Sequence, residues 1–181
     1  VGISGTRVVV SATEDDFGAT DAGSAYVYDL SSGTPTVPAH ILNNPFPALD
    51  DNYGYAVAIS GSQVVVTALT DDTAGTDSGS TYVYDVSSGT PTVPVATLNN
   101  PTPSAADYFG YSAAISGSRV VVGAVYDDTN ATNAGSAYVY DMTSGTPGVP
   151  ALTLNNPGPA ASEDFGHTVA TDVAHVLPNE R

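Results

Sequence analysis

Residues 23–29 read Gly-Ser-Ala-Tyr-Val-Tyr-Asp, and this stretch returns at 79–85 and 135–141, with Thr in place of Ala in the second copy. The tripeptide Ile-Ser-Gly returns at the same interval: 3–5, 59–61 and 115–117. The interval is 56 residues each time, with no insertion or deletion. A fixed period of this length indicates one supersecondary unit copied in tandem, with each copy burying its apolar face against the next.

The middle copy contains four segments with the pattern of β-strands. Residues 55–60 alternate, which places Tyr55, Val57 and Ile59 on one face. The three valines at 64–66 suit a strand that is covered on both faces. No stretch keeps a 3.6-residue period, so we expect no helix. The four expected strands are 55–60, 63–69, 80–86 and 93–98.

Four antiparallel strands in each 56-residue unit are typical of a β-propeller blade, so the sequence predicts an all-β chain of about three blades. Solenoid repeats are usually shorter, and one copy is too small to be a separate sandwich domain. Pro94 lies inside the fourth expected strand and cannot donate to a ladder, which predicts that this strand is the exposed edge of its sheet. We expect a single repeat domain of four parts: 1–53, which lacks most of its first strand, 54–109, 110–165, and 166–181, the start of a fourth repeat or a closing strand.

The chain is strongly acidic, with 19 Asp and Glu against three Arg and no Lys, and a formal charge of −16. This charge excludes nucleic acid as a partner, because the chain has too few cations to neutralise phosphates. No apolar run approaches the roughly 20 residues that cross a bilayer, so we expect no membrane insertion. The many Ser, Thr, Asn, Gly and Pro residues favour an extracellular location. The acidity fits either a solvated surface or specific cation binding.

Three motifs of the third copy resemble the FG-GAP repeat: Phe109-Gly110, Val-Val-Val-Gly-Ala at 120–124 and Gly-Ser-Ala-Tyr-Val-Tyr at 135–140. The resemblance implies the propeller of integrin α-subunits and of secreted bacterial proteins, and it is closest to the bacterial branch. Integrin-like blades carry a calcium loop of the Asp-x-Asp-x-Asp-Gly type between their first two strands. This chain has only Gly61-Ser62 or Gly117-Ser118 at that place, so those calcium residues cannot be carried over.

An acidic loop follows the second expected strand in every copy. Calcium takes about six to eight oxygen ligands, and three such side chains with backbone carbonyls could surround one ion. The same residue types also cap turns through their side chains, and recurrence does not separate the two hypotheses. The candidate calcium ligands are Asp15, Asp16 and Asp21; Asp71, Asp72 and Asp77; and Asp127, Asp128 and Asn133.

A second acidic position precedes the Phe-Gly of each unit: Asp51, Asp107 and Glu163. Together with Phe109 and Phe165 these residues mark the junctions between blades, where we expect the carboxylates to accept backbone N–H bonds. Asn130 begins an N-glycosylation sequon, Asn-Ala-Thr. The paired tyrosines of the third strand fit a sugar-stacking stripe or, better, an inter-blade core: 26/28, 82/84 and 138/140.

No nucleophile elbow, zinc motif or phosphate loop occurs in the sequence. We therefore expect a non-enzymatic extracellular module for adhesion, binding a protein or glycan on a bacterial surface or matrix. The alternative is a structural subunit that polymerises head to tail into a filament by strand complementation, or a ring that another copy or further blades of a longer chain complete. An enzyme is the least favoured class, because near-identical repeats seldom form one asymmetric active site.

Overall fold

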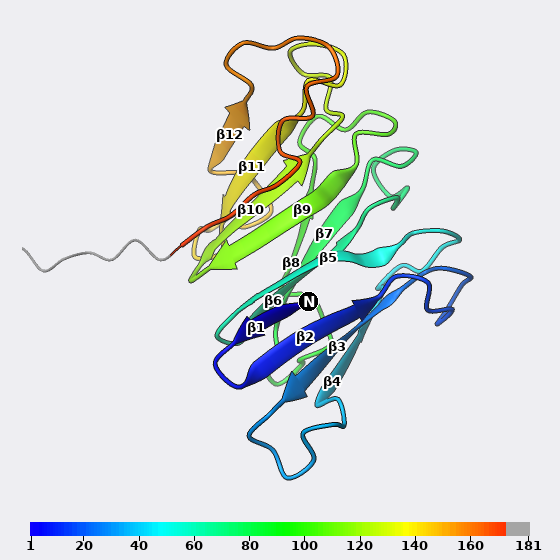
Figure 1. The fold of residues 1–181 in the computed structure, drawn as a ribbon, viewed down its shortest axis with the longest axis vertical. Helices are drawn as coiled ribbons and strands as arrows, with labels where there is room; N and C mark the ends of the chain where they lie inside the picture. The colour runs from blue at the N-terminus through cyan, green and yellow to red at the C-terminus, as the bar shows by residue number, and fades with distance from the viewer. Residues whose placement is uncertain (173–181) are drawn as a thin grey trace, which may run out of the picture.

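The structure, a computed structural model, describes residues 1–172 and consists of three four-stranded antiparallel sheets (Figure 1). These residues contain no helix, and so none that is long and apolar enough to cross a membrane. The predicted all-β architecture of propeller blades is confirmed. The strands are β1 (Gly2–Ser4), β2 (Arg7–Ala12), β3 (Ser24–Asp29) and β4 (His40–Asn43); β5 (Tyr53–Ser60), β6 (Gln63–Ala68), β7 (Ser80–Asp85) and β8 (Ala96–Asn99); and β9 (Phe109–Ser116), β10 (Arg119–Ala124), β11 (Ser136–Asp141) and β12 (Leu152–Asn155).

Each sheet is one sequence unit, with its strands in chain order from one edge to the other. The valines at 64–66 are wholly buried in β6, as expected for a strand covered on both faces. β8 is the outer edge of its sheet, also as expected, but Pro94 is not part of it. Proline has no N–H to give, so pairing starts at Val95, whose N–H donates to Val83 O at 2.7 Å, and Pro94 lies in the preceding loop.

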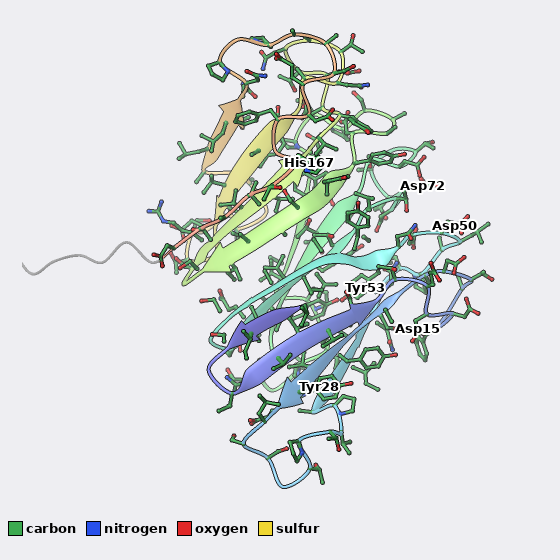
Figure 2. All side chains as sticks on the ribbon, viewed as in Figure 1. Asp15, Tyr28, Asp50, Tyr53, Asp72 and His167 are labelled. Atoms are coloured by element: carbon green, nitrogen blue, oxygen red, sulfur yellow. The ribbon has the colours of Figure 1, made fainter. Side chains whose placement is uncertain are left out.

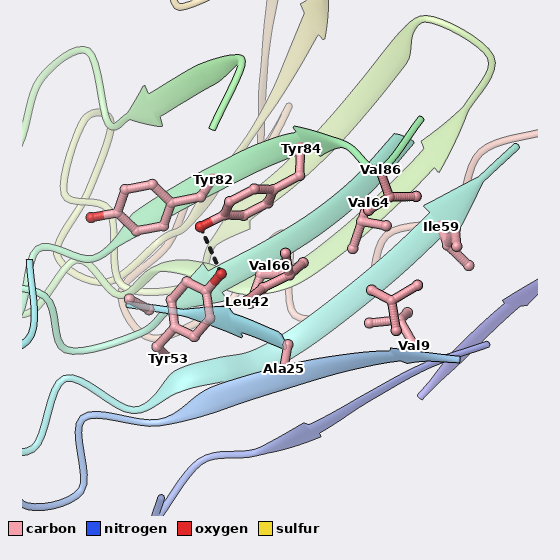
Figure 3. Close-up of a cluster of buried hydrophobic side chains, with 12 residues drawn as sticks. Val9, Ala25, Leu42, Tyr53, Ile59, Val64, Val66, Tyr82, Tyr84 and Val86 are labelled. Carbon is pink, nitrogen blue, oxygen red and sulfur yellow. Dashed lines mark hydrogen bonds between the residues drawn. The ribbon is translucent and has the colours of Figure 1, made fainter. Parts of the chain in front are cut away.

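The sheets pack face to face around shared apolar cores. Tyr82 and Tyr84 lie in the core with the first sheet, and Val83 lies in the core with the third, as strand alternation predicts. Figure 3 shows the first core, in which the Tyr53 hydroxyl donates to the Tyr84 hydroxyl at 2.8 Å. The tyrosine pairs of the second and third units are therefore inter-blade core, which confirms the favoured prediction for them.

The first strand of each full unit begins slightly earlier than expected. β5 starts at Tyr53 and β9 at Phe109, one residue before the expected unit boundaries. The register shifts between Tyr53 and Val57, so the prediction that Tyr55, Val57 and Ile59 share a face is wrong. Val57 and Ile59 pack in the first core, whereas Tyr55 stacks on Tyr111 of the third unit.

Glycines before the third strand let neighbouring sheets approach closely. A Cβ on Gly79 would lie 2.1 Å from Phe109 O, and the φ of Gly79 is 79°. Gly23 and Gly135 meet the backbone of Tyr53 and Phe165 in the same way. Only glycine combines this left-handed conformation with the missing side chain, so this position sets the spacing of the blades.

The stack of sheets is open at both ends and does not close into a ring within the described residues (Figure 1). β1 has three residues where β5 and β9 have eight. Beyond β12, residues 164–170 lie against the third sheet without forming a strand. Residues 173–181 of the expected fourth unit lie outside the described residues.

Candidate functional site

Each acidic loop uses its carboxylates to hold its own backbone. Asp72 Oδ1 accepts the N–H of Asp77 at 2.8 Å, and Asp71 Oδ1 accepts the N–H of Thr73 at 2.7 Å. Asp77 has a φ of 51°, a left-handed turn position that Asp and Asn tolerate. The loop carboxylates thus act as turn-forming acceptors. The same bonds recur in the loops that contain Asp15, Asp16 and Asp21, and Asp127, Asp128 and Asn133.

The three acidic loops do not assemble a ready-made cation site. Across residues 1–172, no group of three or more His, Asp or Glu side chains has an arrangement that could hold a metal ion. A calcium ion in a loop would have to compete with the backbone N–H groups that its carboxylates already accept. Calcium binding at these residues stays a prediction, which a calcium titration can test.

A buried polar cluster joins the second and third units behind the loops. Asn100 Nδ2 donates to Asp107 Oδ2 at 2.8 Å and also lies 3.4 Å from Asp127 Oδ2. The N–H of Ser104 donates to Asp107 at 2.6 Å, and the hydroxyl of Tyr138 donates to Asp127. Asp107 and Asp127 are each only 1% exposed. The structure therefore brings a junction carboxylate and a loop carboxylate together out of contact with bulk solvent.

The negative charge of this cluster is incompletely compensated. Asp107 Oδ1 is buried without a hydrogen-bond partner. Burial, and then the charges of Asp127 and Asp128, raise the pKa of Asp107 to about 6. Burial also raises the pKa of Asp51 at the preceding junction. By contrast, hydrogen bonds from the Tyr26 hydroxyl and the Phe17 backbone lower the pKa of Asp15, which has no junction carboxylate before it in the described chain.

The other junctions repeat this arrangement with different burial. Asp51 accepts Asn44 Nδ2 at 2.7 Å and the N–H of Ala48 at 2.6 Å, and it is nearly fully buried. Glu163 accepts Asn156 Nδ2 and the N–H of Ala160 at 2.6 and 2.7 Å, but it is exposed. The three junction carboxylates thus hold the link between units, and only the two that a following sheet covers are buried.

The two junction phenylalanines differ in the same way. Phe109 is fully buried between the second and third sheets. Phe165 is half-buried, and its N–H donates to Ala134 O at 3.0 Å. Together with Val169 it borders an apolar cleft on the third sheet, where Val121 and Leu154 form part of the wall. The position that a following blade would fill is therefore only partly covered within residues 1–172.

An aromatic surface that the sequence analysis missed lies where the first strands begin. Tyr55 and Tyr111 stack with ring centroids 5.4 Å apart, and Tyr111 stacks on His167 at 4.8 Å. Tyr111 Oη also lies 3.2 Å from His167 Nε2. Next to them, Tyr108 stacks on Tyr126 at 5.4 Å. We call these five residues the aromatic patch: Tyr55, Tyr108, Tyr111, Tyr126 and His167.

The two stacks of the aromatic patch form one surface. Tyr108 of one stack and Tyr111 of the other are three residues apart in the chain, and the N–H of Tyr111 donates to Tyr108 O at 3.1 Å. Tyr55 remains 42% exposed and His167 is exposed, whereas the other three rings are half-buried. Burial, and then hydrogen bonding to Tyr111, raise the pKa of Tyr55 to about 12. The Tyr55 hydroxyl therefore stays protonated near neutral pH and can donate or accept hydrogen bonds.

Charge is distributed unevenly along the sheets. Arg7 and Arg119 pair in register with Asp29 and Asp141 at the start of the second strands. The acidic loops follow the opposite end of these strands, and Figure 2 shows Asp15, Asp50 and Asp72 on that side. A six-residue strand spans about 20 Å, so both described arginines lie far from the loops and from the aromatic patch.

The predicted glycosylation site is accessible in this fold. Asn130 is exposed in the acidic loop of the third unit, three residues before Asn133. The loop backbone is held by its own Asp–amide bonds, which do not involve the side chain of Asn130. A glycan could therefore be attached without disturbing the loop, and its presence stays a prediction.

Comparison with known proteins supports the repeat assignment. Residues 47–84 and 95–140 match the family model described as the FG-GAP repeat. No curated protein matches the chain. FG-GAP repeats are typically found in extracellular proteins. The two matched segments fall in the second and third units, whose sheets have the four-stranded form of propeller blades. The second and third units therefore contain FG-GAP repeats, over the residues that the family model matches.

Proposed function

We propose that this chain is a non-catalytic extracellular module that recognises a protein or glycan partner through the aromatic patch. The observation that carries the proposal is the exposure of aromatic rings that the inter-blade cores do not use. Tyrosine provides large, rigid and amphipathic contact area at low entropic cost, and it is enriched where proteins bind partners. The patch is carried by the ends of β5, β9 and β10, which are anchored in a packed scaffold.

The remaining polar groups support a role without catalysis. The loop carboxylates accept backbone N–H bonds in all three copies. The pKa of Asp107 is raised, but Asp107 and the neighbouring Asp127 are each only 1% exposed and so almost inaccessible to a substrate. Carboxyl groups with a raised pKa also occur in structural clusters. The pKa of Asp51, at the preceding junction, is raised as well, and this recurrence favours a structural role.

An array of glycans and synthetic peptides tests the proposal directly. The wild-type chain should bind a defined subset of the array, and Tyr55→Ser should weaken that binding because it removes the most exposed tyrosine ring of the patch. Thr90→Ala is the matched control, since Thr90 is exposed in the turn between the third and fourth strands. Equal binding by Tyr55→Ser and wild type, or no binding by either, would contradict the proposal.

A second candidate function is head-to-tail assembly, and the two open faces favour it. Val10 is 39% exposed, whereas its equivalents Val66 and Val122 are fully buried against the preceding sheet. Leu154 is 44% exposed, whereas its equivalent Leu98 is fully buried against the following sheet. The two faces are thus the two halves of the contact that the repeat forms inside the chain, and we propose a second copy as the occupant.

Sedimentation of two variants tests this assembly. Val10→Asp damages the face of the first sheet and Leu154→Asp damages the face of the third, so each variant alone should be monomeric. An equimolar mixture retains one intact face of each kind and should form dimers that grow no further. Wild-type chain that stays monomeric at high concentration, or variants that associate as well as wild type, would exclude the second candidate.

A further inference from the structure

At two positions the third unit has tyrosines where the second unit has smaller polar residues. Tyr108 and Tyr126 occupy the places that Asn52 and Thr70 occupy 56 residues earlier. In the second unit these two side chains form a hydrogen bond of 2.9 Å between Asn52 Nδ2 and Thr70 Oγ1. In the third unit the same place holds a ring stack with an interplanar angle of 46°. The backbone tolerates either pair, because Asn52 and Tyr108 share a φ of 53°.

The exchange enlarges the aromatic surface at one place only. Tyr55 and Tyr111 already stack at an angle of 52°, and the Tyr108–Tyr126 pair joins them through the backbone bond from Tyr111 N–H to Tyr108 O. The tilts of 46° and 52° leave ring faces that neighbouring rings do not cover completely. Faces of aromatic rings carry negative potential, which attracts a cation within about 6 Å of the ring centroid. A cation–π partner for these rings is therefore the first ligand to consider.

The described chain places no Lys or Arg at the patch, whose five residues include one basic group, the imidazole of His167. The sequence has no Lys, and Arg7 and Arg119 lie opposite Asp29 and Asp141 in the strand ladders, at the far end of the strands. The patch lies at the end that carries the acidic loops, in a chain of net charge −16. An acidic surface raises the local concentration of cationic ligands and repels anionic ones. The charge of the chain and the geometry of the rings thus both favour a cationic ligand.

We infer that the aromatic patch binds an organic ammonium group, of the trimethylammonium type, that is held over the rings of Tyr55, Tyr108, Tyr111 and Tyr126. Such a group is weakly hydrated, so ring faces can replace its hydration shell at little cost. The inference rests on the proposed binding function and specifies its ligand. The group can belong to a small solute or to a choline headgroup at a lipid surface, and the experiment separates these sources.

Calorimetry with choline and with its neutral isostere 3,3-dimethylbutan-1-ol tests the inference on the full chain. The two probes share their shape and differ in charge, so choline should bind more tightly, by about 2-fold to 30-fold for a cation–π contact. Added salt should weaken choline binding and leave the isostere unaffected. Flotation with phosphatidylcholine vesicles then shows whether a headgroup is also bound. Equal binding of both probes, or no choline binding, would overturn the inference.

Two variants assign the site. Tyr108→Asn with Tyr126→Thr copies the pair that the second unit already contains, so it should fold normally and lose most of the choline affinity. Tyr108→Phe with Tyr126→Phe keeps the rings and should retain that affinity, whereas a sugar site would lose hydroxyl hydrogen bonds. Circular dichroism checks the fold of both. Choline binding that the Asn/Thr variant retains would refute this location.

The outcomes also separate this inference from the proposed function. If array ligands bind in a manner that depends on Tyr55 but choline does not, the ammonium inference fails and the binding function stands. If neither choline nor any array ligand depends on the patch, both fail together. Choline binding that is lost in the Asn/Thr variant supports both.

Discussion

Replacing Asp107 by Asn tests the electrostatic balance of the buried junction. The pKa of this carboxyl is raised from 3.8 to about 6, mainly by burial, so the folded state binds the proton more tightly than the unfolded chain does. The free energy of unfolding should therefore fall as the pH rises from about 4 to about 6, and stay lower above that range. The difference between a pKa of 3.8 and one of about 6 corresponds to at most about 3 kcal/mol in the free energy of unfolding.

Screening reduces this value. The surface beside the cluster is hollowed where Thr102, Asp128 and Thr129 meet, which brings water close to the junction. We therefore expect a contribution of about 1 to 3 kcal/mol. Asn at position 107 keeps an oxygen acceptor for Asn100 and Ser104 while removing the charge. The variant should be more stable than wild type by this amount at about pH 7.5, and its stability should change less between about pH 4 and pH 7.5.

Urea unfolding followed by far-ultraviolet circular dichroism measures both effects. Asp141→Asn is the control, because the Thr143 hydroxyl and N–H lower the pKa of this exposed carboxyl. The Asp141 carboxyl contributes to the free energy of unfolding with the opposite sign. Its contribution is present above the pKa of the unfolded chain and is lost as the pH falls through the pKa of the folded state. That variant should therefore not gain stability near neutral pH. An Asp107→Asn chain less stable than wild type at about pH 7.5, or with an unchanged pH profile, would refute the reasoning.

Three further predictions concern the blade spacing, the junction and calcium. Gly79→Ala should destabilise the fold by on the order of 3 kcal/mol or more, because its Cβ would lie 2.1 Å from Phe109 O. Gly89→Ala is the control and should not destabilise it, because the space around Gly89 is open. Urea unfolding measures both variants. Tyr138→Phe should cost about 1–3 kcal/mol in the same assay, because buried Asp127 loses a donor. If the acidic loops bind calcium as predicted, thermal unfolding should occur at a higher temperature in calcium than in EDTA; equal transitions would mean that the loop carboxylates serve only as acceptors for backbone N–H bonds.

The candidate site was predictable only in part. The acidic loops and junction carboxylates were visible as recurring residues, because polar turns follow apolar strands at a constant interval. The sharing of Asn100 Nδ2 by Asp107 and Asp127 was not visible, since it joins a linker to a loop of the following unit. The aromatic patch had a signal in Tyr55, Tyr111 and His167, which stand 56 residues apart. Strict alternation placed Tyr55 on the same face as Val57 and Ile59, and the register shift in β5 overturned that prediction.

The sequence by itself determined the repeat, the strands and the alternation of core faces. These features depend on local rules: side chains of a strand point to opposite faces in turn, and glycine marks the positions that need a left-handed backbone. Tertiary structure alone decided which carboxylates become buried together and which tyrosines remain exposed. Both depend on how one sheet is placed against the next. Tyr82 is buried because a sheet lies over it, while Tyr26, the same residue in the same motif, remains half-buried because none does.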